Sequence, residues 1–183
     1  LWDVTNPYLY TMKSIVMVEH KAVDEYNTRF GIRQMEFKAD TGFWLNGQNM
    51  KIKGVCLHHD LGALGSAVHR RAIEREIEII KSMGVNAIRT AHNPPSPQLL
   101  DVCDEQGILV IDEAFDTWQR AKAKHDYSRH FNDWWEQDLE AFIKRDRNHP
   151  SIIAWSIGNA VQEQWEEPRV ANPKKNKSVQ LTR

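Results

Sequence analysis

The sequence is poor in cysteine, has no long hydrophobic run and carries no excess of charge of either sign. Cys56 and Cys103 are the only cysteines among 183 residues. They form no Cys-x-x-Cys pair and no metal-binding spacing, so we expect two small buried hydrophobic side chains. No apolar run approaches the roughly 20 residues of a transmembrane helix, and 24 basic against 25 acidic residues give a net charge of −1. Neither nucleic acid nor a membrane is therefore an expected partner.

Two families of motif are also missing. The sequence has no Gly-x-Gly-x-x-Gly, which argues against a dinucleotide-binding fold, and no His-x-His or His-x-x-x-His, which argues against metal catalysis. We therefore expect no cofactor and no metal. What the sequence does have is 41% hydrophobic residues and seven tryptophans. Indole faces often stack on sugar rings, although large cores use tryptophan as well.

The first 38 residues are typical of β-structure. Two residue patterns mark turns: Asn6-Pro7 between extended segments, and Asn46-Gly47, which suits a type I′ hairpin turn. The expected extended segments and the hairpin cover residues 8–10, 15–18, 29–33 and 43–48.

From about residue 51 the pattern alternates between short apolar strands and helices with one apolar face. We expect strands over 51–56, 86–90, 108–111 and 151–157. We expect helices over 70–83 and 97–106. The second begins after the N-cap Ser96 with Pro97 and stops at Gly107. A third helix passes through Trp135 and Ile143 and ends before Pro150. This β-α-β-α-β-α-β order predicts a parallel sheet with helices outside it. It does not separate an open sheet from a barrel.

Polar side chains follow each expected parallel strand. In order along the chain they are His58, His59 and Asp60; Arg89, His92 and Asn93; Asp112, Glu113 and Asp116; and Asn159. Because the carboxyl ends of parallel strands converge on the active site of such folds, these residues predict a polar pocket for a polyhydroxylated ligand.

Each of these residues also has a purely structural interpretation. The histidines after the first strand could be ordinary loop residues, and Arg89 could pair with Asp112 or Glu113 for stability alone. Glu113 is as well explained by structure as by function. Trp118, in the long loop at about 114–130, could cover the barrel rather than contact a ligand.

Several segments resemble one known family in sequence order. Residues 145–160, Arg-Asp-Arg-Asn-His-Pro-Ser-Ile-Ile-Ala-Trp-Ser-Ile-Gly-Asn-Ala, resemble the acid/base signature of glycoside hydrolase family 2, which ends in Gly-Asn-Glu. The family includes β-galactosidases, β-glucuronidases and β-mannosidases. Other segments that resemble the family are 86–95, 107–114, 53–60, and 1–10 with 29–33.

The resemblance implies an α/β fold: the first half of a (β/α)8 TIM barrel, preceded by the C-terminal strands of an immunoglobulin-like β-sandwich. It places residues 1–38 in the sandwich and 39–183 in the barrel. It also implies roles for individual residues, which comprise Asn159 for the sugar 2-hydroxyl, Arg89 near the nucleophile, His92 and His58 along the sugar site, and Asp116 and Trp118 in a loop like that of some bacterial members.

The implied reaction is hydrolysis of terminal β-glycosidic bonds with retention, through two carboxyl groups about 5–5.5 Å apart. The acid needs a raised pKa to hold its proton near neutral pH, and Ala160, at its position, cannot supply one. The replacement is either engineered or the mark of a degenerate gene. The nucleophile is expected on a later strand outside the chain, so we expect this chain to be inactive and, alone, poorly soluble.

We expect a carbohydrate substrate, and β-galactosides are favoured by the resemblance of the Asp116 and Trp118 loop. The alternatives are a catalytically dead carbohydrate-binding protein descended from a glycosidase, and a non-sugar α/β enzyme with coincidental motifs. The sequence leaves open whether the full-length protein is a homo-oligomer. It also leaves open whether it resides in a bacterial cytoplasm or periplasm.

Overall fold

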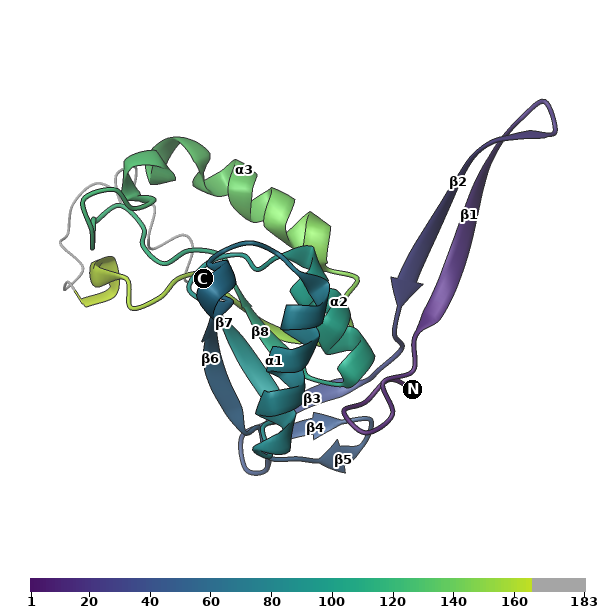
Figure 1. Ribbon diagram of the computed structural model, residues 1–183, viewed down its shortest axis with the longest axis horizontal. Coiled ribbons are helices and arrows are strands. Elements are labelled where there is room, and N and C mark those ends of the chain that lie inside the picture. Colours follow the sequence, from purple (N-terminus) through teal and green to yellow (C-terminus); the bar gives the residue numbers. More distant parts are fainter. Residues whose placement is uncertain (166–183) are drawn as a thin grey trace.

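A computed structural model describes residues 1–165. Three sheets are present in this part of the chain: a two-stranded, a three-stranded and a four-stranded one (Figure 1). The strands are β1 Tyr10–Val18, β2 Lys21–Phe30, β3 Met35–Lys38, β4 Gly42–Leu45, β5 Gln48–Asn49, β6 Gly54–His58, β7 Ala87–Ala91, β8 Leu109–Glu113 and β9 Ile152–Ser156. The helices are α1 Arg70–Ser82, α2 Pro97–Gln106 and α3 Ser128–Asp146, with short 3-10 turns at Gly62–Leu64 and Gln162–Trp165.

The four-stranded sheet has the order β6-β7-β8-β9, and all its neighbouring strands are parallel. Each strand connects to the next through one of the helices, which is the βαβ repeat of a TIM barrel. Half of such a barrel is therefore present, as the sequence predicted. The strands begin or end within a few residues of the expected positions.

The outer face of this sheet is covered by α1 and α2, and the main hydrophobic core lies between the sheet and these two helices. On α1, Ile73, Ile77 and Ile80 recur at helical spacing and are all buried. They pack with Ile88 of β7 and Val110 of β8. The single apolar stripe predicted from the sequence is thus the surface that attaches α1 to the sheet.

The ends of α2 follow the sequence signals in position, but not in every contact. Ser96 is the N-cap residue and Pro97 opens the helix, yet the Ser96 hydroxyl makes no capping hydrogen bond. Gly107 ends the helix in the left-handed conformation, with φ 72°. A Cβ there would lie 2.5 Å from the carbonyl oxygen of Val4, so Gly107 also allows the N-terminal segment to pack closely.

The three-stranded sheet lies at the amino end of the barrel strands, and its apolar side chains pack against them. Phe43 and Leu45 of β4 join Trp2, Leu109 and Ile153 in a second buried cluster. The hairpin turn predicted at Asn46-Gly47 is present, with both residues at positive φ.

The position of β3 bears on the domain division. It pairs with β4 over Met35–Lys38, so the predicted boundary after residue 38 would separate two paired strands. That boundary stays a prediction, and this pairing favours an earlier one.

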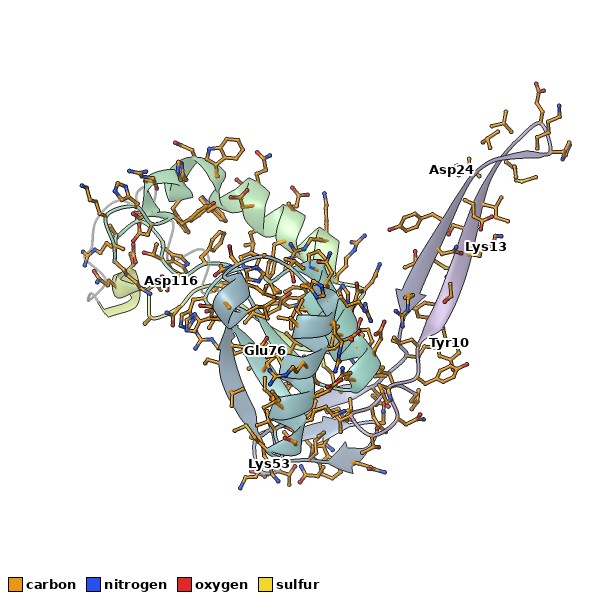
Figure 2. All side chains as sticks on the ribbon, viewed as in Figure 1. Tyr10, Lys13, Asp24, Lys53, Glu76 and Asp116 are labelled. Atoms are coloured by element: carbon orange, nitrogen blue, oxygen red, sulfur yellow. The ribbon has the colours of Figure 1, made fainter. Side chains whose placement is uncertain are left out.

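The β1–β2 hairpin projects away from the rest of the chain (Figure 1). Its side chains point into open space on both faces, as Tyr10, Lys13 and Asp24 show (Figure 2). The expected strand over 29–33 is wrong beyond Phe30, because β2 ends there. Arg33 instead donates hydrogen bonds to the carbonyls of Pro150 and Ile152, which ties the N-terminal segment to the start of β9.

The outer strands of the four-stranded sheet, β6 and β9, each pair on one side only within the described residues. Unpaired strand edges are surfaces that further strands can join. Within the same residues, no helix is both long enough and apolar enough to cross a membrane.

Candidate active site

The candidate site lies at the carboxyl ends of the parallel strands, on the face of the sheet turned away from the helices. The register pairs His58 with Ala91 and Glu113 with Ser156 across this end of the sheet. Two residue pairs before His58 and Ala91, Cys56 faces Arg89. Side chains at alternate positions share a face, so Arg89, Glu113 and Ser156 point to the same side.

Glu113 is the centre of the site and has no exposed surface. One carboxylate oxygen, Oε2, accepts hydrogen bonds from Arg89 Nε at 2.8 Å and Nη2 at 2.6 Å, and also from the Ser156 hydroxyl. The other, Oε1, lies 2.7 Å from His92 Nδ1. A buried charge is costly unless it is paired and hydrogen-bonded, and Glu113 is both. The Arg89–Glu113 ion pair considered from the sequence is therefore present.

The same arginine also reaches the end of β9. Arg89 Nη2 donates to Asn159 Oδ1 at 3.1 Å, and the Asn159 amide nitrogen donates to Asp116 Oδ1 at 2.9 Å. Three predicted site residues from three strand ends thus form one chain of hydrogen bonds. Burial raises the pKa of Asp116. Hydrogen bonds from Asn159 and Lys122, together with the Lys122 charge, lower it by more, so the pKa decreases overall.

Lys122 belongs to this cluster and was missed from the sequence. Its ammonium donates to the Asp116 carbonyl at 2.6 Å, to the Asp116 carboxylate at 3.1 Å and to the Asn159 carbonyl. It lies in the long loop after β8, where lysine is common and no spacing marks it. Only the folded loop brings it to Asn159.

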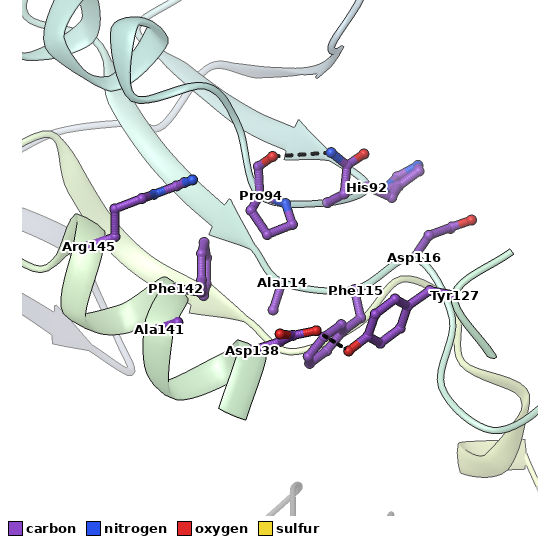
Figure 3. Close-up of a pocket in the computed structure, with 11 residues that line it drawn as sticks. His92, Pro94, Ala114, Phe115, Asp116, Tyr127, Asp138, Ala141, Phe142 and Arg145 are labelled. Atoms are coloured by element: carbon purple, nitrogen blue, oxygen red, sulfur yellow. Dashed lines mark hydrogen bonds between the residues drawn. The ribbon is translucent and has the colours of Figure 1, made fainter. Parts of the chain in front are cut away.

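His58 and His92 are neighbours, as expected for residues that line one site. Their rings meet edge to face with centroids 5.3 Å apart. His92 also borders a cavity of about 370 Å³ between the ends of β7 and β8 and helix α3. Figure 3 shows His92 and Asp116 near one end of this cavity and Arg145 near the other, with Phe115 and Phe142 between them.

Trp118 is a correction to the sequence-based prediction. It has no exposed surface and packs in a buried cluster that includes Phe131 and Val161. Its indole nitrogen donates to the Ile157 carbonyl at 2.8 Å. A side chain buried in this way presents no face to a sugar, so the alternative of a covering residue holds. The sequence could not separate the two because both place a tryptophan in this loop.

Trp118 supports the turn that carries the next residues. A Cβ on Gly158 would lie 2.8 Å from the Trp118 indole nitrogen and 2.8 Å from Val161 Cγ1. Only glycine allows the backbone to come this close. The close contact with Trp118 therefore fixes the backbone at Gly158, directly before Asn159.

Ala160 follows Asn159 and is exposed. Its φ of 39° lies in the left-handed region that few residues other than glycine adopt. The side chain at this position neither joins the packed interior nor lies far from Arg89, since the adjacent Asn159 contacts that arginine.

Asp112, beside Glu113 on β8, lies on the opposite face. It is fully buried. Burial raises the pKa of Asp112 most, and the negative charge of Asp146 and a hydrogen bond with Asp146 raise it as well, to about 7 in total. Arg145 instead donates to both carboxylate oxygens of Asp146, each at 2.6 Å. Among the described residues, no group of three His, Cys, Asp or Glu side chains is placed to hold a metal ion.

Two family models match the chain along nearly its whole length. The TIM barrel domain of glycosyl hydrolases family 2 matches residues 36–183, and a second model, glycosyl hydrolases family 2, matches residues 1–33. The chain belongs to glycosyl hydrolase family 2.

Several glycosyl hydrolases resemble the chain closely. β-Galactosidase BoGH2A of Bacteroides ovatus is 56% identical over 169 residues, which are 92% of this chain and 20% of the relative. The crystal structure of a β-glycosidase from Bacteroides vulgatus superposes with a TM-score of 0.88 at 45% identity, over 98% of this chain and 22% of that one. The β-glucuronidase of Parabacteroides merdae gives a TM-score of 0.74 at 35% identity, over 86% and 19%. The chain thus spans about a fifth of the length of these glycosyl hydrolases.

Proposed function

We propose that the full-length protein containing this chain is a retaining glycosidase that hydrolyses terminal β-glycosidic bonds, with β-galactosides as its substrates. The chain supplies part of the sugar-binding surface, and the nucleophile comes from a barrel strand beyond it. The observation that supports this most directly is the position of residue 160. It is exposed and directly follows Asn159, which is bonded to Arg89 at the strand ends where such sites form.

In this proposal each residue of the network has one task. Glu113 holds the Arg89 guanidinium at the centre of the site, where its charge stabilises the nucleophile carboxylate. Asn159 donates an N–H to the sugar 2-hydroxyl, and His58 and His92 line the same sugar position. The side chain at 160 would give a proton to the leaving oxygen. In retaining enzymes this acid and the nucleophile flank the scissile bond, with their carboxyl groups roughly 5–5.5 Å apart.

Ala160 has no proton to give, so the step that suffers is departure of the leaving group. General acid–base assistance contributes typically about 10²–10⁴-fold in rate. Substrates whose leaving group departs without protonation should lose less than alkyl glycosides. Sugar binding should survive, because the other residues of the network remain in place.

The choice of β-galactosides rests on the similarity to one relative. BoGH2A, named a β-galactosidase, is 56% identical to the chain, whereas the P. merdae enzyme at 35% identity is a β-glucuronidase. A panel of aryl β-galactoside, β-glucuronide and β-mannoside substrates tests this choice. Preference for either of the other two sugars would overturn it and leave the proposed mechanism standing.

A second candidate function is carbohydrate binding without catalysis, which Ala160 itself favours. The two candidates differ in the strand beyond this chain. A glutamate at the matching nucleophile position supports a glycosidase with one lesion, and its absence supports a binding protein.

The decisive experiment restores the acid. In the full-length protein, Ala160→Glu should raise hydrolysis of aryl β-galactosides by about 10²–10⁴-fold, with larger gains for poorer leaving groups. Ala160→Gln is the matched control, because glutamine has a similar shape but no proton to donate at neutral pH. Equal rates for the two variants would show that position 160 is not the acid.

A further inference from the structure

The Asn159 carboxamide is held on both sides by groups of opposite charge. Its oxygen accepts from the Arg89 guanidinium at 3.1 Å, and its nitrogen donates to the Asp116 carboxylate at 2.9 Å. A guanidinium has only donors and an ionised carboxylate only acceptors. The two neighbours therefore accept one orientation of the amide and reject the flipped one, in which both contacts would become repulsive.

Asp116 is in turn held by Lys122. The ammonium contacts three oxygen atoms, two of Asp116 and the carbonyl of Asn159, and its side chain is only 24% exposed. The loop around Lys122 is itself fixed, because the backbone nitrogens of Lys122 and Ala123 both donate to one carboxylate oxygen of Asp126, at 2.6 and 2.8 Å. The loop after β8 is thus attached to the end of β9 beside residue 160.

We propose that Asp116 and Lys122 are positioning residues that fix the Asn159 amide so that its second N–H faces the sugar 2-hydroxyl. This rests on the function proposed above. Asn159 has two amide hydrogens, and Asp116 takes one of them. The other is left for a ligand, and its direction is set by the first. Asp116 acts through Asn159, whether or not its half-exposed carboxylate also contacts the sugar.

The electrostatics of Asp116 support this role over that of a substitute proton donor for the missing glutamate. The net decrease in the pKa of Asp116, in which hydrogen bonds from Asn159 and Lys122 outweigh burial, keeps the carboxylate ionised near neutral pH. An ionised carboxylate accepts from Asn159 and has no proton to deliver. Its charge is also compensated by Lys122, which lies 3.1 Å away.

The test measures how much the sugar 2-hydroxyl contributes to kcat/KM. In the full-length protein carrying Ala160→Glu, kcat/KM is compared for an aryl β-galactoside and its 2-deoxy analogue. Asp116→Asn keeps the size of the side chain but offers the Asn159 amide no charge. It should lower the ratio of the two kcat/KM values by about 10-fold or more, the factor expected for loss of a hydrogen bond to a charged group. Lys122→Met should lower the ratio by a smaller factor.

The control is Asp133→Asn, an exposed carboxylate on α3, which should leave the ratio unchanged. General damage to the fold lowers both kcat/KM values together and also leaves the ratio unchanged, so an Asp116→Asn variant that is merely weaker overturns the positioning role. If the Ala160→Glu parent hydrolyses neither substrate, the proposed function fails first. If the parent is active and Asp116→Asn keeps its ratio, only the positioning inference fails.

Discussion

Two neighbouring acidic residues of β8 have opposite environments on the two faces of the parallel sheet. Glu113 points to the inner face and receives hydrogen bonds from Arg89 and Ser156, with His92 at 2.7 Å. Asp112, one residue earlier, points to the outer face, where Thr90 is 3.4 Å from one oxygen. Its other oxygen accepts no hydrogen bond from an N–H or hydroxyl group of the described residues, and a hydrogen bond with Asp146 requires a proton on one of the two carboxyl groups. Both side chains are fully buried.

The difference shows that burial alone does not identify a functional carboxylate. Glu113 has a surplus of donors and joins residues from three strands, so its charge organises a site. Asp112 is poorly satisfied and lies beside a second buried carboxylate, Asp146, so its charge is a cost to the fold. We therefore expect changes on the inner face to affect both activity and stability, and changes on the outer face to affect stability alone.

The largest expected effect concerns the faces as a whole. In the chain alone, helices cover the outer face, whereas inner-face residues such as Cys56, Ile111 and Ala154 are at least partly exposed. The expected burial of both cysteines is therefore confirmed for Cys103 and wrong for Cys56, which lies on the inner face. The edges of β6 and β9 are unpaired within the described residues. We predict that the isolated 183-residue chain aggregates on expression and gains solubility when the remaining barrel strands are present. A soluble monomer that melts cooperatively, measured by calorimetry and light scattering, would refute this.

Next in size is removal of the inner carboxylate. Glu113→Ala in the full-length protein leaves the Arg89 guanidinium, His92 and Ser156 without their common partner. Breaking a buried ion pair in this way costs about 3–5 kcal/mol, so the barrel should melt at a distinctly lower temperature. In the Ala160→Glu background, hydrolysis should be lost as well. Glu113→Gln, which keeps the shape, should recover part of the stability. A variant as stable as the parent would show that Glu113 does not hold the network together.

A smaller effect is expected at Gly158, which carries no chemistry. Gly158→Ala places a Cβ within 2.8 Å of the Trp118 indole nitrogen, so the turn before Asn159 must move. Overpacking of this kind costs about 1–3 kcal/mol, and a shift of about 1 Å in a positioning element can cost about 10²-fold in rate. The matched control is Gly54→Ala, where the nearest atom to the new Cβ is at 3.4 Å. Equal activity in both variants would show that the Trp118 contact does not position Asn159.

How much of this could be predicted from the sequence depends on whether an element is local. The helix stripe on α1, the glycine that ends α2 and the Asn46-Gly47 turn are local signals, and all three were predicted correctly. Polar residues after each strand also indicated where the site lies, because strand ends converge in parallel sheets. The sequence predicted only the end of β2, because polar and apolar residues do not alternate along this strand.

Side-chain direction was the part that could not be predicted. Lys122 reaches Asn159 across 37 positions of sequence, and nothing in the loop indicates it. Trp118 could equally have faced a sugar or the core until the loop was placed. Asp112 and Glu113 are adjacent acidic residues, and only the strand register shows which one faces Arg89.

The smallest effect on activity should come from the outer carboxylate, whose replacement should instead increase stability. The native Asp112 keeps its proton up to about pH 7, whereas an unfolded aspartate loses it near pH 3.9. Between these values the native state binds more protons, so the free energy of unfolding falls as the pH rises. Asp112→Asn removes this loss. It should match the parent at pH 4 and melt at a higher temperature than the parent at pH 8. The free energy of unfolding at pH 8 should rise by no more than a few kcal/mol, since one pKa unit corresponds to about 1.4 kcal/mol.

Activity separates this variant from the inner-face changes. Asp112→Asn in the Ala160→Glu background should hydrolyse aryl β-galactosides at the parent rate, because Asp112 contacts neither Arg89 nor Asn159. Thermal melts at pH 4 and pH 8, with the parent measured beside the variant, cancel the contribution of other groups such as His149. If the variant is destabilised equally at both values, the charge of Asp112 does not oppose folding. If hydrolysis falls while stability rises, the two faces of the sheet are not independent, because a carboxylate on the outer face would then affect catalysis on the inner face.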